Sequence, residues 1–303
     1  MKLYKVTIKP ISTFTTLPKG DTIFGQLCWS IKYRFGKERL EKLLSNYDNE
    51  PFLIVSDAFV KGYLPKPNMP HKFLKEDPLL KKENRKKVWM KLEDLLEGNY
   101  KNAKTNKDIR NIDKQIVTIH NALNYKTFHT GDGFDPYGIE EFYLSKKDIY
   151  FLLNENSLSF EEFKEVFELF SQIGFGKKVT IGKGRFKILS YEEININNSS
   201  KFFMSLSPFS ANGLECKDIY YEPFTRFGKF GADRAYKNAF KKPILLADTA
   251  SVVEYDEKKS LEDIKYIGKG IRGISDIPEY SNSVHQGYAI VLPLGEAKWK
   301  NID

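Results

Sequence analysis

The order of strand and helix patterns along the first 190 residues restricts the chain to few folds. Alternating apolar residues at 4–8 predict a strand, the three-and-four spacing at 24–35 predicts a helix, and residues 52–59 predict a second strand. Asp21 stands where the N-cap of that helix is expected. The opening segment therefore predicts a β-α-β unit.

A second unit follows an interruption. Residues 116–119, 141–144 and 148–153 predict three strands, and a glycine-rich loop at 130–138 joins the first two. A last strand is predicted at 185–189. The unit thus has strands on both sides of its helix.

The clearest helix pattern in the chain lies between these strands. Ser159 and Glu162 have the spacing of a capping box, and Gly174 is placed to end the helix. Four phenylalanines and a valine, three or four residues apart, form its apolar stripe. The complete order is β-α-β, insertion, β-β, α-β, which is the split βαβ or ferredoxin-like plan of an α+β protein.

The interruption is a basic insertion at about 65–115 within a first lobe at 1–190. Between His71 and Lys114 there are 13 Lys or Arg against 8 Asp or Glu. Part of it, at 88–96, is compatible with a helix. Its charge fits an RNA contact and a solvated face without a partner equally well.

A second, strand-rich lobe is expected at 191–303, after a linker-like stretch at 195–200. Propensity alone does not define its topology. The segments that predict strands there are 202–206, 244–249, 251–255 and 288–292.

The net charge of +8 indicates an anionic partner, and nucleic acid, an acidic protein surface and a membrane headgroup layer all fit it. The two cysteines, Cys28 and Cys216, are far apart and predict buried thiols in a reducing compartment. No segment approaches the roughly 20 apolar residues of a membrane span. We therefore expect a cytoplasmic protein without a membrane anchor.

The most informative segment for function is the glycine-rich loop at 174–184, which leads from the predicted helix into a strand. Four glycines allow close approach of the backbone and expose its N–H groups, and no acid occurs at 174–190. This mixture suits a phosphate-rich ligand. The candidate RNA-binding residues there are Gly176, Lys177, Lys178, Gly182, Lys183, Gly184 and Arg185.

Two nucleotide-binding motifs are excluded. A P-loop has four residues between its glycines, whereas Gly176 and Gly182 have five between them and Gly184 follows Lys183. The dinucleotide fingerprint follows a strand and precedes a helix, which is the reverse of the order here. We expect no nucleotide cofactor.

The four histidines, His71, His120, His129 and His285, do not have the spacing of metal ligands. His120, with Asn121, ends a predicted strand, where a satisfied histidine and an RNA contact both fit. His129 beside the 130–138 loop is a candidate general acid or base for RNA cleavage. Asp57 is expected to be a turn former at a strand end.

In the second lobe, the segment 226–231 alternates aromatic residues with cations and glycines. Such a segment stacks on bases while its charges hold phosphates, or forms the core of a strand. Arg226 and Lys229 are therefore further candidate RNA contacts.

These segments together resemble the RAMP-superfamily proteins of CRISPR systems, most closely the fourth subunit of the type III-A (Csm) interference complex. The resemblance rests on residues 18–29, His120-Asn121, residues 182–186 and residues 285–289, in this order. It therefore spans nearly the whole chain.

The resemblance implies two ferredoxin-like (RRM-type) lobes, with antiparallel sheets and helices on one face. It also implies binding of the 5′ handle of the guide crRNA, and docking between the large polymerase-like subunit and the backbone RAMP subunit in antiviral defence. No catalytic residue transfers to this chain. The alternatives are a RAMP endoribonuclease that processes crRNA precursor with His129 or His120, and a structural adaptor for acidic partners.

Overall fold

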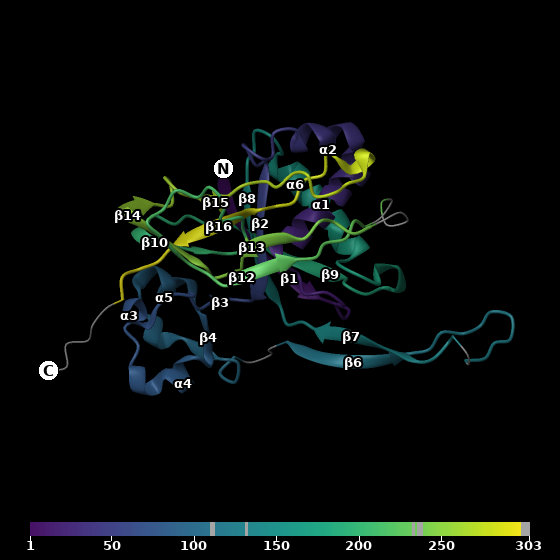
Figure 1. Ribbon diagram of the computed structural model, residues 1–303, viewed down its shortest axis with the longest axis horizontal. Helices are drawn as coiled ribbons and strands as arrows, with labels where there is room; N and C mark the ends of the chain where they lie inside the picture. The colour runs from purple at the N-terminus through teal and green to yellow at the C-terminus, as the bar shows by residue number, and fades with distance from the viewer. Residues whose placement is uncertain (110–112, 131–132, 232–233, 235–238, 298–303) are drawn as a thin grey trace.

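A four-stranded antiparallel sheet forms the centre of the first lobe (Figure 1). The computed structural model describes residues 1–109, 113–130, 133–231, 234 and 239–297. The spatial order β2-β8-β1-β9 is that of the ferredoxin-like plan, so the sequence prediction is confirmed for this lobe. The strands are β1 (Lys2–Pro10), β2 (Leu53–Val60), β8 (Lys147–Leu153) and β9 (Phe186–Glu193).

Helices cover one face of this sheet. The phenylalanine stripe of one of them, residues 160–173, packs on the sheet because it needs an apolar partner. The ring of Phe151 on β8 lies 4.9 Å from that of Phe163 and 5.2 Å from that of Phe167. The predicted capping box is present, with the backbone N–H of Ser159 donating to the Glu162 carboxylate at 2.9 Å. The helices are α1 (Gly20–Phe35), α2 (Lys37–Leu44) and α6 (Phe160–Ile173).

The prediction that Asp21 caps α1 is wrong. Lys19 is the N-cap residue and makes no side-chain capping bond. The carboxylate of Asp21 is buried and accepts two hydrogen bonds from Arg226, at 2.6 and 2.7 Å. The guanidinium offers this carboxylate two charge-assisted donors at once, and the carboxylate turns toward the second lobe to accept both.

The insertion is a small subdomain with its own three-stranded sheet, ordered β3-β4-β5. The helix expected at 88–96 is only half present, because residues 87–90 pair as a strand with two neighbours and the helix begins at Leu92. Its elements are β3 (Leu64–Pro65), α3 (His71–Leu74), η1 (Pro78–Leu80), α4 (Lys81–Asn84), β4 (Lys87–Met90), α5 (Leu92–Glu97), η2 (Tyr100–Asn102) and β5 (Lys104–Thr105).

A two-stranded hairpin, β6 (Lys114–His120) with β7 (Tyr137–Tyr143), projects from the first lobe (Figure 1). Both strands were expected from the sequence. Of the glycine-rich loop between them, Gly131 and Asp132 lie outside the described residues.

The second lobe repeats the strand order of the first. Its sheet runs β11-β14-β10-β16-β15, and without the edge strand β15 this is the same ferredoxin-like order. The described part of this lobe contains no α-helix; loops, β15 and η5 stand in the two connections that hold helices in the first lobe, and the hairpin β12-β13 lies between β11 and β14. The elements are β10 (Ser199–Ser205), β11 (Asp218–Tyr220), β12 (Pro223–Arg226), β13 (Ile244–Ala247), β14 (Val252–Ser260), β15 (Tyr266–Gly268), η5 (Pro278–Tyr280) and β16 (Tyr288–Pro293).

The two lobes pack directly on each other through β16, which contacts β2 and β8. Every residue of β8 and β16 is buried, as expected for strands covered on both faces. In the chain as described, no helix is long and apolar enough to cross a membrane.

Candidate nucleic-acid interface

The glycine-rich loop has a defined structure, and the turn that closes it accepts only glycine. Gly184 has φ 75°, and a Cβ there would lie 2.1 Å from the carbonyl oxygen of Phe175. The two residues also pair, because the Phe175 N–H donates to the Gly184 carbonyl at 2.9 Å. Between them, residues 179–181 form the short 3₁₀ helix η3 (Val179–Ile181). The loop therefore has a fixed shape.

This loop packs against the segment that follows β1. Thr15 Oγ1 donates to the Lys177 carbonyl at 2.6 Å, and the Gly184 N–H donates to the Thr13 carbonyl at 2.8 Å. Gly176 (φ 86°) lies so close to Thr16 that an added Cβ would stand 3.0 Å from its side chain. Lys177 and Gly176 are thus held by residues far away in sequence.

The exposed cations of the loop are Lys177, Lys178 and Arg185. Within the described residues none of the three forms a salt bridge, so their charge is available to an anionic ligand. Lys178 adopts the left-handed conformation (φ 64°), and its ammonium lies 5.7 Å from the ring centre of Tyr137 on β7. The loop and the hairpin therefore meet at one surface.

Lys183, in contrast, is already paired. Its ammonium donates to Glu141 Oε2 at 2.7 Å and to Thr13 Oγ1 at 2.9 Å. The sequence around the loop contains no acid, but the hairpin brings this one from β7. Burial opposes ionisation of Glu141, yet hydrogen bonds from Lys183 and Thr13 outweigh it and lower the pKa of the carboxyl group.

His120, at the end of β6, lies on the other side of the same carboxylate. Its Nε2 is 3.6 Å from Glu141 Oε1, and both atoms are buried without a hydrogen bond to any described residue. The imidazole stacks on Tyr137, with ring centres 5.9 Å apart, and the next residue, Asn121, is exposed. We call the exposed residues Asn121, Tyr137, Lys177, Lys178 and Arg185 the loop–hairpin surface.

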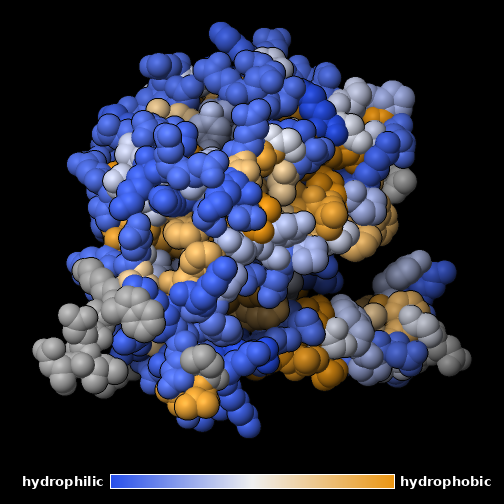
Figure 2. Space-filling model, turned by 60° about the vertical axis from the view of Figure 1, so that its left-hand side comes forward, coloured by the Kyte–Doolittle hydropathy of each residue, from blue (hydrophilic) through white to orange (hydrophobic). Residues whose placement is uncertain are grey.

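Beyond this surface the hairpin exposes apolar and aromatic side chains. Val117 is 61% exposed, Ile119 67%, Tyr125 77% and Phe128 78%. Figure 2 shows apolar patches along the projecting arm. Exposed groups of this kind on a monomer mark a contact with another molecule. The sequence predicted both strands, but it held no signal that they form a separate two-stranded sheet.

Arg226 and Lys229 lie elsewhere, on and just after the hairpin strand β12. Arg226 is bound to Asp21, and its guanidinium stacks over Phe224 at 4.7 Å. Its charge is therefore balanced inside the protein. Lys229 is exposed, with its ammonium 4.2 Å from the ring centre of Phe240.

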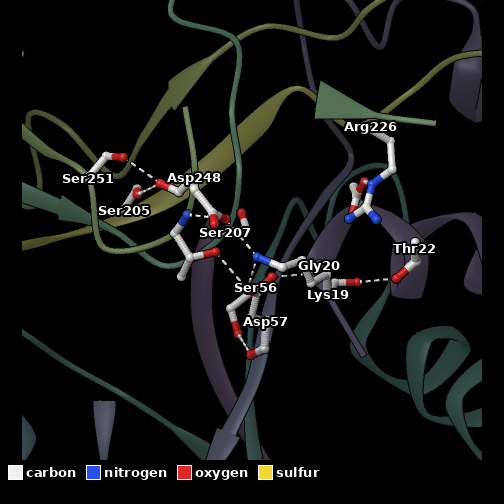
Figure 3. Close-up of polar contacts among 12 residues, drawn as sticks. Lys19, Gly20, Thr22, Ser56, Asp57, Ser205, Ser207, Arg226, Asp248 and Ser251 are labelled. Atoms are coloured by element: carbon white, nitrogen blue, oxygen red, sulfur yellow. Dashed lines mark hydrogen bonds and ion pairs between the residues drawn. The ribbon is translucent and has the colours of Figure 1, made fainter. Parts of the chain in front are cut away.

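Asp57 belongs to the junction between the lobes (Figure 3). It lies at a bulge within β2, so its assignment to a strand-end turn is wrong. Its carboxylate accepts from the Gly20 N–H at 2.7 Å and from Thr249 Oγ1 at 2.6 Å, with the Lys19 ammonium 3.5 Å away. Burial raises the pKa of Asp57, and Lys19 opposes this effect.

Gln286 joins the lobes a short distance away. Its side-chain amide accepts from the Val55 N–H at 2.9 Å and donates to the Val55 carbonyl at 2.8 Å, fully buried. His285 Nε2 lies 3.4 Å from Asp21 Oδ2. Two segments that carry the family resemblance, 18–29 and 285–289, thus meet at this junction.

Acidification is expected to destabilise the protein through His285. Burial lowers the pKa of His285 to about 4; Asp21 opposes this, while Lys241 and Arg226 add to it. Between that value and the ordinary pKa of about 6.5, the unfolded chain binds a proton that the folded chain excludes. Stability therefore falls as the pH falls through this window, by about 3 kcal/mol in total. Denaturant unfolding of the wild type and His285→Gln at several pH values measures it; parallel curves would contradict it.

His129, the candidate catalytic residue, is exposed at the hairpin loop. Among the residues that the structure describes, no acid or second base contacts its side chain. No group of three or more His, Cys, Asp or Glu in the described ranges is arranged to hold a metal ion. The hairpin loop thus offers an exposed imidazole without a catalytic partner from the described chain.

Solved structures share this fold. A chain in the crystal structure of a Csm1–Csm4 cassette in complex with cA4 matches with a TM-score of 0.61 and 16% identity, over 99% of this chain and 100% of that chain. A chain in a Csm3–Csm4 subcomplex of the type III-A CRISPR-Cas interference complex matches with a TM-score of 0.61 and 16% identity, over 97% and 100%. No protein-family model and no curated protein sequence matches. Csm4 is the subunit common to the two assemblies. The likeness shows that this chain shares a fold with the chains it matches.

Proposed function

We propose that this chain is a Csm4-like, non-catalytic subunit of a type III-A CRISPR interference complex. It would hold the 5′ handle of the crRNA in the cytoplasm and link the large polymerase-like subunit to the backbone subunit. The observation that carries the proposal is the extent of the likeness, 99% of this chain and 100% of the chain it matches. Both lobes, the insertion and the hairpin lie within it.

The loop–hairpin surface supports the RNA contact. Three exposed cations, Lys177, Lys178 and Arg185, lie on a loop whose glycines bring the backbone to the surface. Phosphates bind such cations and backbone N–H groups, and exposed aromatic rings such as Tyr137 stack on unpaired bases. Gly182, at φ 86° with no atom within 4 Å of an added Cβ, leaves open space beside the backbone for a ligand.

Arg226 and Lys229 together offer an RNA ligand less uncompensated positive charge than the sequence alone indicated. Arg226 brings no uncompensated charge, since Asp21 neutralises it. Lys229 is exposed, and Lys242, which is exposed as well, is paired with Asp276 at 2.6 Å. We therefore propose Lys229 as the RNA contact there and Arg226 as the residue that attaches the hairpin to α1.

Co-purification tests the proposal. Coexpression with the large and backbone subunits of a type III-A complex should yield an assembly whose RNA, when sequenced, begins with a repeat-derived 5′ handle. Recovery of the chain without these subunits and without RNA would refute it. Incubation of the purified chain with labelled repeat RNA tests the endoribonuclease alternative, which requires a product that His129→Ala abolishes.

Neutralising Lys177, Lys178 and Arg185 together with glutamine is expected to weaken binding of single-stranded RNA by about 100-fold at roughly 0.1 M salt. Each lost phosphate contact reduces the log–log salt slope by about 0.7, so the slope should become shallower by about 2. Titration of a labelled RNA at several salt concentrations measures both quantities.

A matched control removes the same charge elsewhere. Lys37, Lys42 and Lys201 are exposed, on α2 and β10. Their replacement with glutamine should leave the salt slope near that of the wild type. Equal effects of the two triple variants would show that net charge, and not the loop–hairpin surface, determines binding.

A further inference from the structure

One carboxylate joins the two segments that build the loop–hairpin surface to the segment that follows β1. Glu141 is 2% exposed, although it lies on a hairpin whose other residues are mostly exposed. It accepts from Thr13 Oγ1 at 2.6 Å and from the Lys183 ammonium at 2.7 Å. These partners come from the segment after β1 and from the glycine-rich loop.

The surrounding backbone contacts place this carboxylate at the base of the hairpin. The N–H of Phe14 donates to the Phe142 carbonyl at 3.0 Å, and the N–H of Phe142 donates to the Phe14 carbonyl at 2.7 Å. Next to this pair, the Gly184 N–H donates to the Thr13 carbonyl. The side chain of Glu141 therefore lies where the hairpin, the loop and the segment after β1 come together.

We propose that Glu141 is a positioning residue for RNA binding, which fixes the glycine-rich loop against the hairpin base through Lys183 and Thr13. The inference deepens the proposed function and rests on it. The carboxylate itself is too buried to contact a ligand. It acts by holding the backbone N–H groups and the free cations of the loop in one arrangement, which reduces the ordering that binding requires.

Because Glu141 carries a negative charge, the proposal can be tested by whether its replacement strengthens or weakens RNA binding. A negative charge beside the loop repels RNA, so its removal strengthens binding if only the electrostatic potential matters. Removal also leaves the Lys183 ammonium without its carboxylate partner and takes away one connection between the hairpin base and the loop. If positioning dominates, loss of the acid weakens binding instead.

The test compares two variants of the full-length protein that remove the same charge. Glu141→Leu removes the hydrogen bonds, whereas Glu141→Gln keeps an acceptor for Thr13 and Lys183. Titration of a labelled single-stranded RNA oligonucleotide should show about tenfold weaker binding for Glu141→Leu and near wild-type binding for Glu141→Gln. Tighter binding by Glu141→Leu, or unchanged binding with only a lower melting temperature, would overturn the proposal.

Thr13→Val keeps the test decisive if Glu141→Leu fails to fold. This change removes the hydrogen bond that Thr13 donates to the carboxylate and the one that it accepts from Lys183, without a change in charge, so a loss of affinity of about threefold is expected. Unchanged affinity would count against positioning. Failure of the wild-type protein to bind any RNA is a distinct outcome, because it refutes the proposed function before Glu141 is considered.

Discussion

Replacing Gly20 with alanine is expected to cost about 4 kcal/mol of unfolding free energy or more. A Cβ at this position would lie 2.2 Å from the carbonyl oxygen of Val55 and 2.9 Å from Cβ of Ser207. One of these atoms belongs to the backbone of β2 and the other to the second lobe, so neither moves without opening the junction. The Gly20 N–H would also lose its 2.7 Å bond to Asp57. Equilibrium denaturation measures the change.

Gly25 provides a matched control within the same helix. An added Cβ there meets no atom within 4 Å. Alanine is a better helix former than glycine by about 1 kcal/mol, so Gly25→Ala is expected to stabilise the protein by up to that amount. Opposite signs for the two substitutions would confirm that the clash matters; similar values would contradict it.

Replacing Gln286 with leucine is expected to cost about 4 kcal/mol. The amide of Gln286 serves both the N–H and the carbonyl of Val55, and all of these groups are buried. Leucine fills a similar volume but leaves two backbone groups unsatisfied, at about 1–3 kcal/mol each. A side chain serves as partner here because β2 is the edge strand of its sheet, so no neighbouring strand among the described residues pairs with the outer side of Val55.

Denaturant titration of Gln286→Leu, with Gln172→Leu as its control, measures this effect. Gln172 is exposed near the end of α6, where the same substitution should change stability by less than about 0.5 kcal/mol. A loss below about 1 kcal/mol in Gln286→Leu would show that water or a local shift satisfies Val55.

Local patterns predicted the first lobe because each of its elements is specified by residues only a few positions apart in sequence. The capping box at Ser159 and the phenylalanine stripe of α6 depend only on neighbouring positions, and both are present. The strand at 87–90 was missed because its pairing partners, not its own residues, determine it. The second lobe was predictable as strands, but its lack of helices in the described residues has no local signal.

The candidate site divides in the same way. Glycines and cations located the loop at 174–184, since both features are local. The partner of Lys183 was not predictable, because Glu141 lies 42 residues earlier and reaches the loop only through the hairpin. Asp57 and Asp21 were likewise assigned local roles at turns and caps, whereas each one bonds to the other lobe.

The projecting hairpin has a consequence for how the chain behaves before assembly. Within the described residues, β6 and β7 pair with each other and, apart from the short bridge at Phe14, with no other strand. The outer edges therefore present unpaired amide and carbonyl groups next to apolar side chains such as Ile119. Such an edge is a template for strand addition by a second copy. Covering it would protect the chain from self-association as well as complete a larger particle.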